Sequence, residues 1–285
     1  MWTLENERFT ATVQASGGEL VSLWHKQTRT ERLWKPQAAV WNHTATQLFP
    51  VVGRLVHDGL WLDGQFWPLP AHGFLREQTF YCLGQTSNTL TLEACSTAQT
   101  LLQWPRRWRV RLEFALDASG LTFRQTIKND DSRILPYSAG WHPGFALPVA
   151  SRAGWWVEFS PAVSGPFFTC DRTLETGGGP RDVTRFALTD TCFAAGAVYF
   201  GDARRRVIRV CAPDGTLALT LETGEHPWLA LWGVPGADLL CIEPLAGTTD
   251  APDADGQAAN KRGMQHLPAG ESQTFAVRLR FAVDA

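Results

Sequence analysis

Four polar residues of this 285-residue chain stand in short motifs in which glycine or proline adjoins an apolar run. They are Arg54 in LFPVVGRL, His72 in LPAHGFLRE, His142 in SAGWHPGF and Glu243 in LLCIEPLAG. A histidine and a glutamate that meet in one pocket can carry out acid–base chemistry, in which one group donates a proton while the other accepts one. His142 and Glu243 are therefore the candidate catalytic pair.

A proline follows each member of this pair. Pro143 disfavours helical backbone at the preceding residue and so predicts an extended conformation for His142. Pro244 lacks the N–H that a sheet ladder needs, which predicts that a strand ends at Glu243. Both side chains are thus expected to be held at defined positions.

Each of the four residues also has a purely structural interpretation. A lone histidine is commonly a hydrogen-bonded core residue, a glutamate at a strand end is commonly solvated, and an arginine after glycine commonly forms a surface ion pair. The functional interpretation depends on all four residues sharing the same kind of motif beside an apolar strand.

The elements that must position these residues show an almost purely two-residue periodicity. Residues 108–129 alternate apolar and polar on both sides of an Asp-Ala-Ser-Gly turn, and residues 206–223 repeat the design around Pro-Asp-Gly. Both stretches predict β-hairpins. Since no stretch longer than about ten residues has helical apolar spacing, we expect an all-β fold, a large antiparallel β-sandwich or barrel. A single domain spanning residues 1–285 is expected.

Composition limits the function classes. The net charge is −2, so no overall field recruits nucleic acid or an anionic membrane, and no apolar run approaches the roughly 20 residues of a membrane span. Six cysteines are scattered without a C-x-x-C pair, which predicts reduced thiols in a cytoplasmic protein. Neither a metal-ligand spacing nor a glycine-rich phosphate loop is present, and we expect no metal and no cofactor.

Two further features suit a small-molecule site. Thirteen tryptophans against three tyrosines is an unusual ratio, and tryptophan faces stack on sugar rings as well as filling cores. Residues 248–263 form a long polar loop, and loops of that length within compact domains are often functional.

With these motifs in this order, the sequence resembles the aldose 1-epimerases, or galactose mutarotase-like proteins. The resemblance begins at GGELVSLW near the N-terminus and continues through LFPVVGRL, HGFLRE and GWHPGF to CIEPLAG. It implies a large antiparallel β-sandwich, the galactose mutarotase-like supersandwich, with the sugar site on a concave face. It also implies that the partner is a small sugar. Whether a monomer or a homodimer binds it stays open.

The resemblance assigns roles to individual residues. It implies that Glu243 is the catalytic base, that His142 is the catalytic acid, and that His72 and Arg54 bind the sugar. Asp190, within LTDTCF, falls in the region of a substrate-binding aspartate, although its surroundings depart from the family pattern.

Two other positions bear on the sugar. Arg76 is also assigned to substrate binding. Gly144 stands where many relatives carry an aromatic residue, which suggests a wider pocket.

The implied reaction interconverts the α and β anomers of an aldohexose or a derivative. Glu243 takes the proton of the C1 hydroxyl while protonated His142 supplies the ring oxygen. The ring then opens, rotates about C1–C2 and recloses. A neighbouring carboxylate is expected to hold His142 charged at neutral pH.

Three alternatives stay open. The first is a carbohydrate-binding protein without catalysis. The second is a glycoside hydrolase or lyase module, although hydrolysis calls for two carboxylates and only one stands in a convincing motif. The third is a mutarotase for an anionic sugar, a hexose 6-phosphate or a sulfonated hexose. Arginines bind tetrahedral oxyanions in a bidentate manner, and the candidates are Arg54, Arg76, Arg106 and Arg107.

Overall fold

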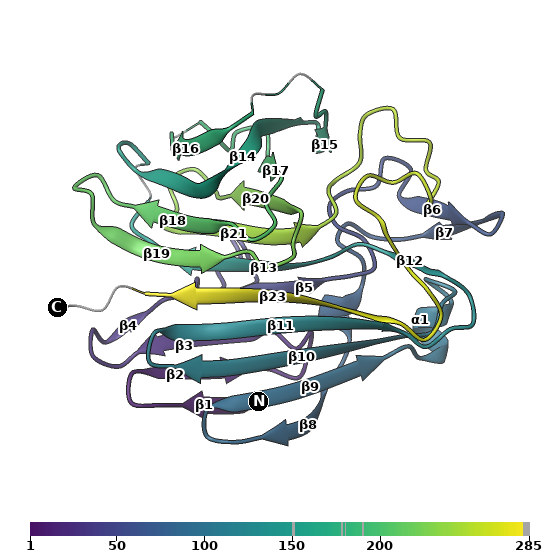
Figure 1. Ribbon diagram of the computed structural model, residues 1–285, viewed down its shortest axis with the longest axis horizontal. Helices are drawn as coiled ribbons and strands as arrows, with labels where there is room; N and C mark the ends of the chain where they lie inside the picture. The colour runs from purple at the N-terminus through teal and green to yellow at the C-terminus, as the bar shows by residue number, and fades with distance from the viewer. Residues whose placement is uncertain (150–151, 178, 180, 190, 282–285) are drawn as a thin grey trace.

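The computed structural model describes residues 1–149, 152–177, 179, 181–189 and 191–281. Within these residues the chain forms twenty-three strands, the short helix α1 (Ala98–Leu101) and the single 3-10 turn η1 (Leu75–Glu77) (Figure 1). The prediction of an all-β fold without long helices is confirmed for this part of the chain.

The strands fall into one large sheet and three small ones. The large sheet has the order β5 (Ala45–Leu48), β13 (Ala139–Ala146), β21 (Leu239–Ala246), β20 (Trp228–Trp232), β17 (Val198–Gly201), β14 (Trp156–Cys170), β18 (Val207–Cys211), β19 (Leu217–Glu222), β23 (Ser272–Arg280), β11 (Gly120–Asn129), β10 (Trp108–Asp117), β9 (Thr89–Cys95) and β8 (Tyr81–Gln85). Strands β15 (Thr173–Leu174) and β16 (Val183–Ala187) pair with β14. The small sheets are β1 (Trp2–Glu5), β2 (Phe9–Val13), β3 (Leu20–His25) and β4 (Thr30–Glu31); β6 (Gly59–Leu62) with β7 (Gln65–Pro68); and β12 (Leu135–Tyr137) with β22 (Gln265–Leu267).

Both hairpins predicted from the alternation are confirmed. Strands β10 and β11 pair from Trp108↔Asn129 to Asp117↔Gly120, and β18 pairs with β19. The Asp117 carboxylate closes the first turn by accepting hydrogen bonds from the backbone N–H groups of Ser119 (2.7 Å) and Gly120 (3.1 Å). An aspartate that bonds the backbone two residues ahead is a common turn former.

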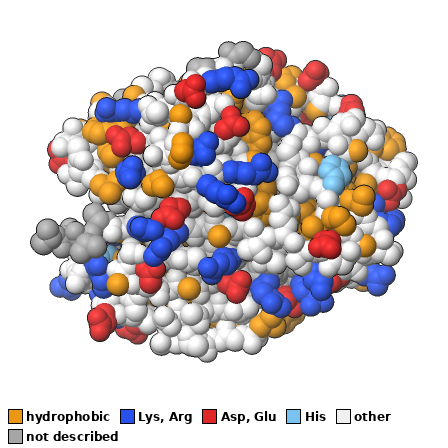
Figure 2. Space-filling model, in the orientation of Figure 1, with side chains coloured by type: hydrophobic (Ala, Val, Ile, Leu, Met, Phe, Trp, Pro, Cys, Tyr) orange, Lys and Arg blue, Asp and Glu red, His pale blue; other side chains and the backbone are white. Residues whose placement is uncertain are grey.

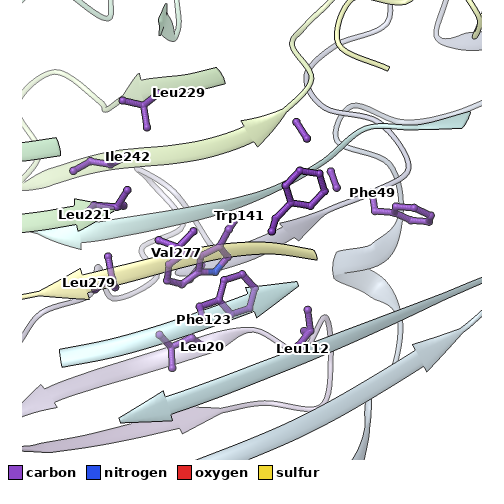
Figure 3. Packing of buried hydrophobic residues seen from close by; sticks show 14 of the residues in the cluster. Leu20, Phe49, Leu112, Phe123, Trp141, Leu221, Leu229, Ile242, Val277 and Leu279 are labelled. Atoms are coloured by element: carbon purple, nitrogen blue, oxygen red, sulfur yellow. The ribbon is translucent and has the colours of Figure 1, made fainter. Parts of the chain in front are cut away.

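The large sheet folds over so that its two ends pack face to face. Trp141 of β13 stacks on Phe123 of β11 with ring centroids 4.6 Å apart, and both side chains are buried (Figure 3). Buried apolar residues of β1, β2 and β3 join the same core. The large antiparallel sheets predicted from the sequence are therefore present, with their core between them.

Alternation along the strands decides which side chains face the core. Trp141 and Ile242 point into it (Figure 3), so their neighbours His142 and Glu243 lie on the opposite face of the sheet. Strand β13 pairs with β21 at Gly140↔Leu245 and again at Gly144↔Cys241. The register between these pairs places His142 directly opposite Glu243.

The prediction that a strand ends at Glu243 is wrong, because β21 continues through Pro244 to Ala246. Pro244 keeps its place by pairing with β20 on the other side, at Leu229↔Pro244 and Ala230↔Glu243. Towards β13 the paired residues stop at Gly140↔Leu245 and resume at Gly144↔Cys241, so the missing proline N–H groups fall in a gap in the ladder. Glu243 is therefore fixed in mid-strand.

The surface carries charges of both signs. On the face shown in Figure 2, basic and acidic side chains are interspersed over the strands, as the net charge of −2 leads one to expect. No helix within the described residues has the length and apolar character needed to cross a bilayer.

Candidate active site

A cavity of about 410 Å³ opens beside His142 and Glu243. Its lining comes from segments that are distant in the sequence, and consists of Trp41, Gly53, Arg54, Ala71, His72, His142, Thr169, Arg172, Gly196, Ala197, Tyr199, Trp232, Glu243 and Thr249. The structure therefore brings Arg54, His72, His142 and Glu243 together in one cavity.

His142 and Glu243 are in contact and almost completely buried. Nε2 of His142 lies 3.4 Å from Oε1 of Glu243, and the two residues are 8% and 3% exposed. One proton can move between these atoms with little rearrangement. A sugar hydroxyl and ring oxygen placed beside them would meet both a proton donor and a proton acceptor.

Burial shifts both pKa values towards the neutral forms. It raises the pKa of Glu243 to about 8, and it lowers the pKa of His142 well below its usual value, with the nearby His72 adding to the effect. The expectation that His142 is charged at neutral pH is therefore wrong for the free protein. Loss of solvation disfavours the charged forms of both the imidazole and the carboxyl group. The resting pair holds one proton, and it resides on Glu243.

His72 is held as a neutral hydrogen-bond donor. The backbone N–H of Gly53 donates to its Nδ1 over 3.2 Å, which leaves the ring proton on Nε2. Burial lowers the pKa of His72 to about 4, and the positive charges of Arg76 and Lys261 push in the same direction. Its backbone has a φ of 67°, which is unusual for a residue other than glycine. The surrounding loop thus holds the imidazole in a fixed orientation beside His142, with ring centroids 5.7 Å apart.

Two tryptophans give the cavity apolar walls. Trp41 stacks on the His142 ring with centroids 4.8 Å apart and an interplanar angle of 23°, and Trp232 stands edge-on to Trp41 at 6.0 Å. Aromatic faces of this kind suit the C–H face of a pyranose ring. Sequence patterns did not single out either residue, because nothing near them in the chain marks them as distinct from core tryptophans.

Gly144 does not widen the cavity as expected. A Cβ atom at this position would lie 2.7 Å from the Trp41 ring and 2.9 Å from Leu239. The space that an aromatic side chain would fill is occupied by Trp41, which comes from a different segment. The glycine therefore allows Trp41 to pack against His142.

A buried ion pair lies within the polar loop 248–263, which reaches the cavity at Thr249. Nζ of Lys261 lies 2.6 Å from Oδ1 of Asp250 and donates to the carbonyl oxygen of Thr248 over 2.9 Å. The backbone N–H of Asp250 donates to the carbonyl oxygen of Arg54, and its carboxylate accepts from the N–H of Val56, both over 3.1 Å. The loop is thereby fixed to the segment that carries Arg54.

The remaining predicted residues lie elsewhere. Arg76 is not among the residues that line the cavity, and its guanidinium lies 3.5 Å from the carbonyl oxygen of Ala71. Arg106 is buried against Ile134 and paired with Asp63, so its role is structural, and Arg107 is exposed and away from the cavity. Asp190 lies outside the described residues.

Among the described residues, no cluster of three or more His, Cys, Asp or Glu side chains is arranged to hold a metal ion. The ionisable side chains that line the cavity, among the described residues, are the imidazoles of His72 and His142, the Glu243 carboxyl, the Tyr199 phenol and the guanidinium groups of Arg54 and Arg172.

Known proteins resemble this chain over nearly its whole length. A sequence profile of the family described as "Aldose 1-epimerase" matches residues 1–280. Protein LacX of Lactococcus lactis subsp. lactis is 28% identical over 263 residues, which cover 86% of this chain and 87% of LacX.

Solved structures agree with this result. A galactose mutarotase-like protein from Lactobacillus casei has a TM-score of 0.90 at 25% identity, covering 99% of this chain and all of the other. A galactose mutarotase related enzyme from Lactobacillus acidophilus has a TM-score of 0.92 at 24% identity, covering 99% and 97% of the two chains.

Proposed function

The chain belongs to the aldose 1-epimerase family, and on that premise we propose that it interconverts the α and β anomers of an aldohexose or a derivative. The observation that carries this proposal is the contact between His142 and Glu243, 3.4 Å apart, in a cavity bounded by Trp41 and Trp232. The sugar would lie on the face of the sheet opposite the core. The family resemblance implies that this face is concave.

The proposed reaction needs two proton transfers for each ring opening. Glu243 accepts the proton of the C1 hydroxyl as His142 gives one to the ring oxygen, and the bond between C1 and that oxygen breaks. Rotation about C1–C2 turns the aldehyde. Reclosure by the reverse transfers then delivers the other anomer.

The neutral state of the free pair fits this sequence of transfers. Opening the ring leaves the proton on Glu243 and the His142 ring neutral, and burial favours that same distribution. The ion pair needed to start the opening differs from it only by one proton moved across the 3.4 Å contact. The apolar surroundings thus stabilise the pair as it stands beside the open-chain aldehyde.

The purified protein is expected to accelerate anomer exchange of at least one aldohexose or derivative without an added cofactor. NMR exchange spectroscopy or polarimetry on glucose, galactose and their 6-phosphates measures this directly. If none of these sugars exchanges faster while a sugar still binds, the protein is a carbohydrate-binding protein and the proposed activity is wrong.

The pH dependence of the exchange rate follows from the active pair holding one proton. Raising the pH through the Glu243 pKa of about 8 removes that proton, so kcat/KM is expected to fall above this pH. Lowering the pH adds a second proton only well below the usual histidine pKa, because burial lowers the pKa of His142. We therefore expect a flat profile between about pH 6 and pH 7.5. A rate that drops between about pH 7 and pH 6 would contradict this assignment.

A further inference from the structure

Arg54 and Arg172 are held beside each other by one buried hydroxyl. Oγ1 of Thr249 accepts a hydrogen bond from the backbone N–H of Arg54 over 3.1 Å and donates to the carbonyl oxygen of Arg172 over 2.6 Å. The Arg54 guanidinium also donates to the carbonyl oxygen of Asp171 over 3.2 Å. Two arginines that are far apart in the sequence are thereby fixed at the same side of the cavity.

Arg172 sits in an unfavourable backbone conformation. Asp171 and Arg172 are the two central residues of the turn between β14 and β15, with φ angles of 48° and 63°. Turns with two left-handed residues favour Asn-Gly or Asp-Gly, so an arginine at the second position carries a steric cost. Backbone strain of this kind is concentrated at active sites and ligand-binding sites.

The two arginines lie between the cavity and a wider outer hollow. Both of them line this hollow of about 770 Å³, together with Asp58, Cys170, Asp171, Ala194 and Ala195. His142 and Glu243 line the inner cavity and do not line the outer hollow. A hexose with C1 at the catalytic pair would therefore direct its far end, at C4 and C6, towards the arginines.

Arg54 and Arg172 both bring a positively charged side chain to the inner cavity. Among the described residues, no carboxylate lies within ion-pair distance of the Arg54 or Arg172 guanidinium. His72 and His142 are neutral there because burial lowers the pKa of each. Asp58 and Asp171 line only the outer hollow. Arginine pairs bind tetrahedral oxyanions through several charge-assisted hydrogen bonds.

We propose that the sugar bound in this cavity carries a tetrahedral oxyanion, a phosphate or a sulfonate, at its far end, and that Arg54 and Arg172 hold that group together. The inference rests on the proposed anomer exchange and specifies its substrate class. Thr249 is the positioning residue that keeps the two arginines in place.

The test compares kcat/KM for glucose, glucose 6-phosphate and 6-sulfonated glucose by NMR exchange. The expected result is a preference of about tenfold or more for one or both anionic sugars, which weakens as salt is added because ionic attraction is screened. A preference for the phosphate alone, for the sulfonate alone or for both identifies which oxyanion the site accepts, and each of these results supports the inference.

Variants locate the contact. Arg172→Gln removes the positive charge and leaves a shorter, neutral polar side chain, and it is expected to lower the ratio of anionic to neutral kcat/KM by about tenfold. Thr249→Val is expected to lower that ratio as well, and Thr249→Ser, which keeps the hydroxyl, is expected to preserve it. Arg107→Gln, an exposed arginine away from the cavity, is the matched control and should leave both kcat/KM values unchanged.

The two proposals fail differently. If glucose or galactose exchanges as fast as the anionic sugars, or if Arg172→Gln leaves the ratio unchanged, the anionic substrate class is wrong and the mutarotase activity stands. If no sugar exchanges faster in the presence of the protein, the proposed function is wrong and the inference fails with it.

Discussion

Replacing Glu243 with Gln is expected to slow anomer exchange by about 10²-fold or more, while sugar affinity stays within a few-fold. Gln preserves the shape of the side chain and its hydrogen-bonding capacity, but it cannot accept the C1 hydroxyl proton. NMR exchange gives the rate, and titration with a non-exchanging sugar analogue gives the affinity. Glu222→Gln, the same change at a surface ion pair with Arg280, is the control.

The same variant separates a catalytic role from a structural one. Burial raises the pKa of Glu243 to about 8, whereas the unfolded chain loses this proton at its ordinary, lower pKa. The free energy of unfolding therefore falls as the pH rises from the unfolded-state pKa towards about 8. Glu243→Gln removes this loss of stability, and its thermal midpoint near pH 8 is expected to equal or exceed that of the unaltered protein. An unfolded variant, or one that exchanges anomers at the original rate, would show that Glu243 has no catalytic role.

Trp141→Ala is expected to lower the free energy of unfolding by about 3–5 kcal/mol. Trp141 is fully buried and stacks on Phe123 between the two ends of the folded sheet, so its removal leaves a cavity in the core. Urea denaturation followed by circular dichroism measures the change.

The adjacent residue provides the comparison for this change. His142→Asn is expected to slow exchange by about 10²-fold with only a small change in the unfolding midpoint, because His142 lines the cavity and lies outside the main core. Equal loss of stability in the two variants would contradict the assignment of their side chains to opposite faces of the sheet.

Local patterns predicted those parts of the fold that local interactions determine. The alternation of residues 108–129 and the Asp-Ala-Ser-Gly turn signal were enough to predict the β10–β11 hairpin. The order of strands in the large sheet depends on pairings such as β13 with β21, a hundred residues apart, and alternation carries no information about them. Only the family resemblance chose this sandwich from among other antiparallel folds.

Local motifs likewise predicted some residues of the candidate site and missed others. Arg54, His72, His142 and Glu243 stand in motifs marked by glycine or proline, and the sequence drew attention to each. Arg172 was missed because its two-residue turn, Asp171–Arg172, lacks the glycine that usually marks such turns.

Burial was the other quantity that the sequence did not supply. A motif shows that a carboxylate and an imidazole can meet, but the directions of the pKa shifts at Glu243 and His142 depend on how completely both are removed from water. Gly144 shows a similar limit, since Trp41, which fills the space beside it, comes from a segment about a hundred positions earlier.

The place of β23 in the large sheet bears on how the molecule assembles during synthesis. This last strand pairs with β11 on one side and β19 on the other, and so joins the two portions of the sheet (Figure 1). Until residues 272–280 leave the ribosome, β11 and β19 each present an open edge that can pair with another chain. Contacts between such distant segments also slow folding. The nascent chain therefore depends on β23, which is made after both of its neighbours, for protection against aggregation, and a product ending before Ser272 would keep both edges exposed.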